Sequence, residues 1–356
     1  MNSKRSISLL VCLVLAVCSL SSCNADGTLN DTGEPQTQAC SYYDYFDTVS
    51  TVLSYRGDSA EEFEANSAAV SELLQEYHRL FDIYYEYSGI NNLKTVNKNA
   101  GVAPVEVDQK LIDFLLYAKQ IYAQTDGTTN IAMGSVLKLW HDARERGIDT
   151  PENAYVPAAD ALAEAAAHTN IDDLIIDEEN RTVFLADPLM RLDVGALGKG
   201  YATEKAAQML IDRGVTSYVL NIGGNIRAIG SKVSGAGWIT GITNPDKSSD
   251  EPFVCKVTIK DVSLVTSGDY ERYYVVDGVR YHHIIDPKTN MPASYFSSVS
   301  IFTADSGLAD ALSTALFCMS YEEGLALVQG IGGVDVIWVT ADGDVKMTDG
   351  VPLYNE

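Results

Sequence analysis

The chain has 356 residues and a formal net charge of −24 at pH 7, with 49 acidic side chains against 25 basic ones. So acidic a protein is not expected to bind nucleic acid or another polyanion. The length and the 46% share of apolar residues are sufficient for one large domain with its own core.

Residues 1–22 have the composition of a secretion signal. Lys4 and Arg5 precede an apolar run that is too short for a membrane-spanning helix, and the run ends in "LSSC". This ending fits a bacterial lipobox, which would make Cys23 the lipidated first residue of the mature protein. A signal peptide without lipidation is the alternative. We therefore expect an extracytoplasmic bacterial lipoprotein that is anchored to the membrane.

Residues 23–40 are polar and contain Gly and Pro without apolar periodicity, so they are expected to form a flexible tether. The folded domain is then expected to cover residues 41–356. Its cysteines show no CxxC spacing and no disulfide framework. Stability must therefore come from the hydrophobic core.

Helices are expected where apolar residues recur at intervals of three and four. Strand pairs are expected where short β-rich runs flank a tight turn, and isolated strands where such runs stand alone. Helices followed by hairpins indicate an α+β fold. The expected helices are 61–84, 108–127 and 157–168, the expected hairpins are 174–185, 217–230 and 273–285, and the expected strands are 238–242, 254–259, 264–267, 298–302 and 334–340.

A glycine-rich stretch, "DVGALGKG", begins at Asp193 and leads into helical spacing. Free N–H groups at a helix start, with Lys199 beside them, could bind a phosphate. A turn with a surface lysine is the alternative. The role of Gly223-Gly224 in "NIGGNIRAIG" also has two explanations. The two glycines could form a hairpin turn, or they could provide backbone that a ligand approaches closely.

Asp310 and Thr314 are four residues apart on a predicted helix, so they share one face. Their oxygens could bind Mg²⁺ if phosphates and water complete its coordination. Alternatively, Asp310 stabilises a helix start and Thr314 bonds to a backbone carbonyl.

His282 and His283 are adjacent in "RYHHIIDPKTN". In a strand they would point to opposite faces, so at most one could enter a shared pocket. A structural or exposed histidine is the alternative to a catalytic one.

Taken in order, "TDGTTNIAMGSVLKLW", "DVGALGKGYATEKAA", "LNIGGNIRAIG", "TSGDYERYY", "HHIIDPKTNMPAS" and "ADALSTALF" resemble the ApbE family of FAD:protein FMN transferases. Many members of that family are bacterial lipoproteins. The resemblance extends from about Tyr42 to the C-terminus. It implies a single ApbE-like domain, related to the T-fold, of antiparallel hairpins and packed helices.

The resemblance implies Mg²⁺-dependent transfer of FMN from FAD to a Thr or Ser hydroxyl of another protein, with AMP as the leaving group. It assigns His283 as the general base, so that His282 would point to the other side of the strand. The implied metal ligands are the Ala196 carbonyl, Asp310 and Thr314. The implied FAD-site residues are Phe46, Tyr84, Thr128, Thr129, Asn130, Asp193, Lys199, Gly223, Gly224, Asn225, Ser267 and His283.

Two positions depart from the family pattern. Phe46-Asp47 replaces a common Met-Gly pair, and Asn130 stands where aspartate is common. Both positions are expected at the flavin, so they bear on flavin affinity and orientation.

Two competing functions remain open, namely an FAD pyrophosphatase and a non-catalytic flavin-binding lipoprotein. A metal site near a histidine favours an enzyme.

The implied acceptors are flavoprotein subunits of redox pumps or exported flavoproteins. The chain has no acceptor-like Ser/Thr-Gly-Ala-Ser/Thr stretch of its own.

Overall fold

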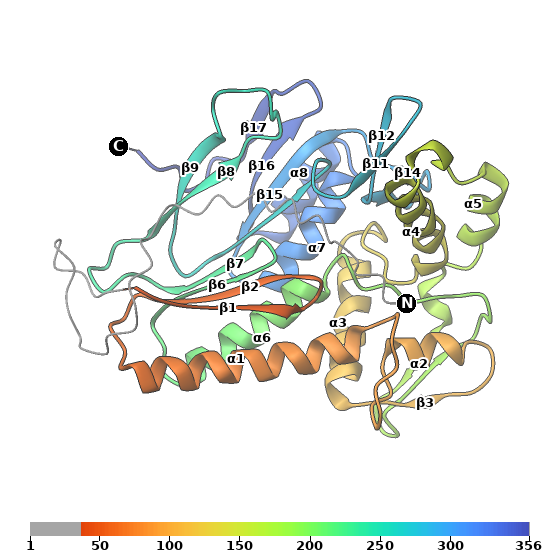
Figure 1. Ribbon diagram of the computed structural model, residues 1–356, viewed down its shortest axis with the longest axis horizontal. Coiled ribbons are helices and arrows are strands. Elements are labelled where there is room, and N and C mark those ends of the chain that lie inside the picture. The colour runs from red at the N-terminus through yellow and green to blue at the C-terminus, as the bar shows by residue number, and fades with distance from the viewer. Residues whose placement is uncertain (1–36, 356) are drawn as a thin grey trace, which may run out of the picture.

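A computed structural model describes residues 37–355 (Figure 1). The signal segment, Cys23 and the tether up to residue 36 lie outside the described residues. The first strand begins at Gln38 and so includes the last three residues of the expected tether. Within the described range, no helix combines the length and the apolar character needed to cross a bilayer.

An eight-stranded sheet forms the centre of the fold, and all of its neighbouring strands run antiparallel. Five of its strands were expected from the sequence, within 217–230, 264–267, 298–302 and 334–340, whereas the first two strands and the last one were not anticipated. In spatial order the sheet contains β1 (Gln38–Tyr45), β2 (Thr48–Ser54), β6 (Ser217–Ile222), β7 (Asn225–Gly230), β10 (Ser263–Gly268), β15 (Phe296–Thr303), β16 (Asp335–Thr340) and β17 (Val345–Met347).

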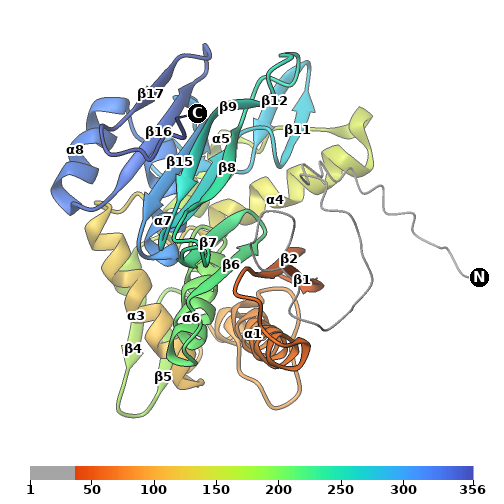
Figure 2. The same ribbon diagram turned by 90° about the vertical axis from the view of Figure 1, so that its left-hand side faces the viewer.

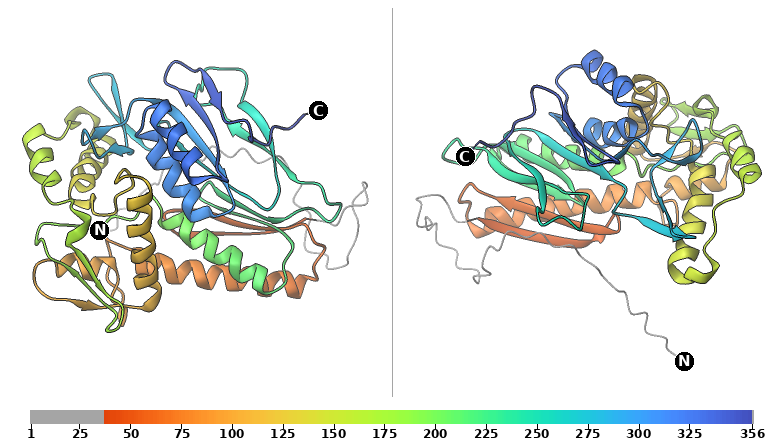
Figure 3. Two further views of the ribbon diagram at one scale, coloured as in Figure 1. Left: turned by 180° about the vertical axis from the view of Figure 1, so that it is seen from behind. Right: turned by 90° about the horizontal axis from the view of Figure 1, so that it is seen from above.

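The two faces of the sheet are covered differently, because side chains alternate along each strand. Tyr218 and Leu220 of β6 join the core on the helical side, whereas Val219 joins the cluster under a separate hairpin. Seen from behind, α6 and α7 lie side by side against the sheet in green and blue (Figure 3). The helices of this side are α1 (Ala60–Phe81), α6 (Gly198–Asp212), α7 (Ser306–Phe317) and α8 (Tyr321–Ile331), and the hairpin opposite is β8 (Trp238–Thr243) with β9 (Phe253–Ile259).

Smaller elements flank this layered centre at one end of the molecule (Figures 1 and 2). A three-stranded sheet lies near α3, and a two-stranded hairpin packs on α4. The α+β fold class is therefore confirmed. These elements are α2 (Leu93–Lys98), β3 (Val105–Glu106), α3 (Gln109–Gln124), α4 (Gly134–Asp149), α5 (Ala159–Ala166), β4 (Leu174–Asp177), β5 (Thr182–Leu185), β11 (Tyr273–Val276), β12 (Val279–His282), β13 (Ile285–Asp286) and β14 (Met291–Pro292).

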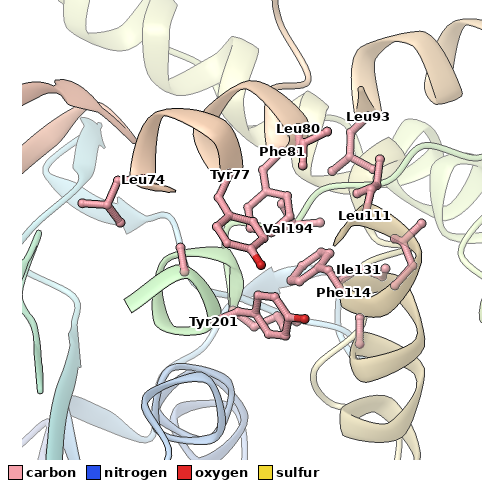
Figure 4. Packing of buried hydrophobic residues seen from close by; sticks show 14 of the residues in the cluster. Leu74, Tyr77, Leu80, Phe81, Leu93, Leu111, Phe114, Ile131, Val194 and Tyr201 are labelled. Carbon is pink, nitrogen blue, oxygen red and sulfur yellow. The ribbon is translucent and has the colours of Figure 1, made fainter. Parts of the chain in front are cut away.

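An aromatic cluster joins α1, α3 and α6 (Figure 4). The ring centroids of Phe81 and Phe114 are 4.2 Å apart, and those of Phe114 and Tyr201 are 5.1 Å apart. Val194, in the loop before α6, is buried in the same cluster. The cluster therefore fixes the start of the glycine-rich loop against three helices.

The contact between α6 and α7 is unusually close at Gly200. A Cβ atom on this residue would lie 2.3 Å from the carbonyl oxygen of Ser306 and 2.4 Å from the Cβ of Asp310. Because no side chain can occupy so small a space, only glycine allows the two helices to meet here.

We expect Gly200→Ala to destabilise the protein. Forcing a methyl group against backbone typically costs about 1–3 kcal/mol of unfolding free energy. Gly330→Ala is the matched control, because a Cβ at this position of α8 meets nothing within 4 Å. That control should stay within about 1 kcal/mol of the wild type, on the stabilising side. Urea unfolding measures both, and equal midpoints for wild type and Gly200→Ala would contradict the close contact.

Candidate active site

The first turns of α6 and α7 are held by each other's carboxylates. The backbone N–H of Gly200 donates to Asp310 Oδ2 over 2.7 Å, and the N–H of Ser306 donates to Glu204 Oε2 over 2.9 Å. Glu204 also accepts a hydrogen bond from Arg227 Nε over 3.2 Å. A negative charge at a helix N-terminus is favoured by the free N–H groups and the helix dipole. These reciprocal hydrogen bonds between α6 and α7 fix the position of Asp310 relative to the glycine-rich loop.

Asp310 is a buried carboxylate, only 5% exposed. Burial raises its pKa, and the nearby Lys199 ammonium, with Nζ 3.8 Å from Oδ1, works in the opposite direction. Asp310 does not cap its own helix, because Asp305 is the N-cap of α7 and accepts from the Leu308 N–H over 2.8 Å. Asp310 therefore does not stabilise the start of its own helix and instead accepts from the first turn of α6.

Lys199 links Asp310 to the turn between β6 and β7. Its Nζ donates to Asn225 Oδ1 over 3.4 Å. Asn225 further favours the ionised form of Asp310, and its buried Nδ2 has no partner with full hydrogen-bond geometry in the described part of the chain. A buried amide donor without a partner is costly unless a ligand supplies an acceptor.

The predicted metal ligands provide hard oxygen donors. Thr314 lies one turn after Asp310 on α7 and is half-buried, as is Ala196 in the loop before α6. Within residues 37–355, no group of three or more His, Cys, Asp or Glu side chains could hold a metal by itself. One carboxylate, one hydroxyl and one carbonyl suit Mg²⁺ when phosphate oxygens and water supply the other ligands. These residues therefore fit the metal that the resemblance implies.

His282 is occupied by structural contacts. Its Nε2 donates to the Ala293 carbonyl over 2.8 Å, and its Nδ1 accepts from the Ile284 N–H over 3.2 Å. The ring meets Phe317 of α7 edge-on, with centroids 5.6 Å apart. His282 therefore anchors the end of β12 to α7, and its replacement would disturb this packing.

His283 has a different environment from its neighbour. Strand β12 ends at His282, so strand alternation, on which the prediction of opposite faces rested, does not extend to His283. Its Nδ1 is buried and has no hydrogen-bond partner among the described residues. Burial, followed by the positive charges of Arg272 and other neighbours, lowers its pKa to about 3. The imidazole is thus neutral at physiological pH and has a nitrogen free to take a proton.

The loop that carries Thr128, Thr129 and Asn130 is fixed to α7. Thr129 Oγ1 donates to the Ala311 carbonyl over 2.9 Å. Asn130 uses both ends of its amide, since Nδ2 donates to the Thr169 carbonyl over 2.9 Å and Oδ1 accepts from the Ala132 N–H over 2.8 Å. Asn130 therefore holds the loop in shape.

Two tight turns lie next to each other, and one of them is near the start of α6. Phe46 and Asp47 connect β1 to β2 with φ values of 54° and 52°, and Gly223 and Gly224 connect β6 to β7 with 58° and 92°. Positive φ at both central residues is typical of two-residue hairpin turns. A Cβ on Gly223 would lie 2.6 Å from the Thr48 side chain. The hairpin-turn interpretation is therefore confirmed, and glycine lets the two turns touch.

Three further predicted FAD-site residues make polar or ring contacts. Ser267 Oγ is 2.8 Å from Ser313 Oγ of α7, which ties β10 to that helix. The Phe46 N–H donates to His78 Nδ1 over 3.2 Å. The ring of Tyr84, which is 52% exposed, lies 5.4 Å from the ring of His141.

Helix α4 supplies two charged or titratable side chains that sequence reasoning missed. Arg144 Nη2 lies 3.2 Å from His141 Nδ1. Burial raises the pKa of Asp193, and the hydrogen bond from the Gly195 N–H and the charge of Arg144 oppose this rise. Arg144 also contributes to the low pKa of His283. An available signal was the helical spacing of the buried residues Val136, Trp140, Ala143 and Gly147, which leaves His141 and Arg144 three apart on the polar side.

Two surface hollows are found away from these residues, around residues 89–91. None of their lining residues is a predicted site residue. The predicted site residues lie instead mainly on the glycine-rich loop, the tight turns, α7 and the segment after β12.

Comparison with known proteins agrees with this arrangement. The model of the ApbE family matches residues 46–338. The chain belongs to the ApbE family. The resemblance seen in the sequence and the fold it implied are thereby confirmed.

Relatives of this ApbE chain include two proteins named FAD:protein FMN transferase. The one from Treponema pallidum is 34% identical over 359 residues, covering 97% of this chain and 93% of the relative. The one from Klebsiella pneumoniae is 32% identical over 286 residues, covering 80% of this chain and 85% of the relative.

Solved structures agree as well. The ApbE protein of Thermotoga maritima has a TM-score of 0.75 and 29% identity, covering 88% of this chain and 97% of that one. The apo flavinyl transferase ApbE of Pseudomonas stutzeri has a TM-score of 0.74 and 25% identity, covering 90% and 97%.

We expect His283 to stay neutral down to about pH 4, because burial holds its pKa near 3. An unfolded histidine takes up a proton near pH 6.5, so this site favours unfolding progressively as the pH falls below about 6.5. Imidazole NMR shifts followed from pH 8 to pH 4 measure the titration, and His283→Gln identifies the signal. A midpoint near 6.5 in the folded protein would contradict the burial of this side chain.

Proposed function

We propose that this ApbE protein transfers FMN from FAD to a Thr or Ser hydroxyl of another protein and releases AMP. The names of its relatives support this activity. The single structural observation that carries it is the neutral His283, whose buried Nδ1 has no partner within residues 37–355. A neutral imidazole can take the proton of an acceptor hydroxyl, and the phosphate anions of bound FAD would raise its pKa toward the working pH.

Helix α7 connects the parts of the proposed site. It carries Asp310 and Thr314, and its last residue, Phe317, contacts the His282 ring that immediately precedes His283. Two of the three proposed metal ligands and the segment with the proposed base are thus attached to one rigid element. Catalysis of phosphoryl transfer depends mainly on positioning and on neutralising charge, and a rigid element supports both.

Each residue has a definite task in this proposal. Asp310, Thr314 and the Ala196 carbonyl would hold Mg²⁺, which would offset the charge of the FAD pyrophosphate. Lys199 binds a phosphate oxygen as a point charge. His283 accepts the proton of the acceptor hydroxyl as its oxygen bonds to the FMN phosphorus and the bond to AMP breaks.

The surroundings of His283 change the pH dependence that is expected for the transfer rate. An unperturbed imidazole would make the rate rise between about pH 6 and 7. Because the pKa of His283 is lowered to about 3, the unliganded enzyme already has the neutral form throughout that window.

We expect transfer to require Asp310 and His283. The mature protein is incubated with FAD, Mg²⁺ and an acceptor flavoprotein domain, and covalent flavin fluorescence on the acceptor is measured. Asp310→Asn should abolish transfer, and EDTA should have the same effect. His283→Ala removes a general base, whose contribution is typically ~10²–10⁴-fold, and should lower the rate accordingly.

The products distinguish the competing functions. Free FMN and AMP without labelled acceptor would mean a pyrophosphatase, and intact FAD would mean a binding protein. His282→Ala serves as the control for the histidine pair. A loss of rate per folded molecule with His282→Ala but not with His283→Ala would contradict the assignment of the base.

We also propose that the protein is a membrane-anchored lipoprotein outside the cytoplasm. "LSSC" at the end of the apolar run supports lipidation of Cys23, and the polar stretch after it supports a tether. This location suits acceptors that are exported flavoproteins or subunits of membrane redox pumps.

We expect Cys23→Ser to release the protein from the membrane fraction once the signal is cleaved, because a serine cannot carry the thioether-linked lipid. Membrane and soluble fractions are compared by immunoblotting, with N-terminal sequencing of each product. A Cys40→Ser variant is the control. Retention of cleaved Cys23→Ser protein in the membrane would contradict lipid anchoring.

A further inference from the structure

Arg144 on α4 is a cation that the function described so far does not use. It lies beyond the end of the motif "TDGTTNIAMGSVLKLW" and belongs to none of the stretches that carry the family resemblance. Its side chain is 19% exposed, so most of the guanidinium and its stem is removed from water. A cation in such a position requires an explanation.

The charge of Arg144 is poorly compensated within the described residues. Its one ion pair is with the neighbouring Glu145, at 3.7 Å, and Glu145 is itself exposed. An ion pair with an exposed partner at this separation contributes little. The other polar contact of Arg144 is with His141 Nδ1, at 3.2 Å. Because arginine only donates, His141 accepts here, and this contact orients the guanidinium without neutralising it.

Arg144 is close enough to two predicted site residues to affect their charge. It acts on Asp193, in the loop before α6, and on His283, in the segment after β12. These two segments come from different parts of the chain, so α4 borders the site between them. The phosphorus attacked by the acceptor hydroxyl must lie near His283. Arg144 also borders the predicted FAD site by contact, because the ring of His141, to which it donates, lies 5.4 Å from the ring of Tyr84.

Helix α4 is firmly attached at this position. The indole N–H of Trp140 donates to the Asn290 carbonyl over 2.9 Å, and its ring stacks on Tyr281 with centroids 5.9 Å apart. Tyr281 and Asn290 lie on either side of the His283 segment in sequence. Arg144, one turn after Trp140, is therefore held in a fixed relation to His283.

We propose that Arg144 binds a phosphate group of FAD, in addition to Lys199, and so determines affinity for the pyrophosphate-bearing form of the flavin. This inference rests on the proposed function, which supplies FAD as the substrate. The two phosphates are the charged groups of FAD, and the planar guanidinium can donate two parallel hydrogen bonds to phosphate oxygens. The flavin ring and the ribityl chain offer no anion of this kind.

The test compares FAD with riboflavin, which has the same ring but no phosphate. Dissociation constants are measured by flavin fluorescence for the mature wild type, Arg144→Gln and Arg144→Lys. Arg144→Gln should weaken FAD binding by about 10–100-fold and leave riboflavin binding unchanged. Arg144→Lys keeps the charge and should lose less.

Arg146→Gln is the matched control, because Arg146 lies on the same helix over the Tyr155 ring, at 5.9 Å, and its loss should leave both constants unchanged. Equal FAD affinity in wild type and Arg144→Gln overturns the inference. An equal loss for FAD and riboflavin also overturns it, since the contact would then not involve phosphate. If the wild type binds no FAD at all, the proposed function fails together with this inference.

Discussion

The structure depends on the close contact between α6 and α7. The two helices are so close at Gly200 that no side chain would fit there. Because glycine has none, its N–H can reach Asp310. In return, Glu204 of α6 accepts from the start of α7 at Ser306. The two helices therefore compensate each other's free N–H groups with carboxylates instead of water. The same contact places the glycine-rich loop beside the proposed metal ligands.

Burial sets the charge states of the site. It raises the pKa of Asp193 and Asp310 and lowers that of His283, so all three groups are pushed toward their neutral forms. Such an arrangement costs stability in the free protein, because buried polar groups are left without full compensation. A metal ion near Asp310 and phosphates near the basic side chains would restore the balance. The site is therefore organised before its substrates bind.

Rigid attachment is the common feature of the segments around the site. The loop with Thr129 is bonded to α7, His282 packs on the end of the same helix, and Trp140 fixes α4 to the hairpin segment. The aromatic cluster of α1, α3 and α6 also packs against the start of the glycine-rich loop. Phosphoryl transfer benefits from such positioning, because little of the catalytic task is covalent chemistry by the protein.

Local patterns in the sequence determined most of the elements. Helical spacing predicted α1 and α3, and β-rich runs on either side of tight turns predicted the hairpins within 217–230 and 273–285. These features depend on backbone preferences and side-chain periodicity, which neighbouring residues specify. The ordered motifs also predicted the family and, with it, the proposed site residues.

Only the tertiary structure decided how these residues are used. Asp310 serves the start of another helix, His283 lies beyond the end of its strand, and Arg144 reaches the site from a helix outside the motifs. Each of these facts depends on contacts between segments that are distant in sequence. Burial and charge at a residue arise from all the elements packed around it. The sequence by itself therefore determined the elements and the family, and the packing of α4, α6 and α7 decided the chemistry available to each side chain.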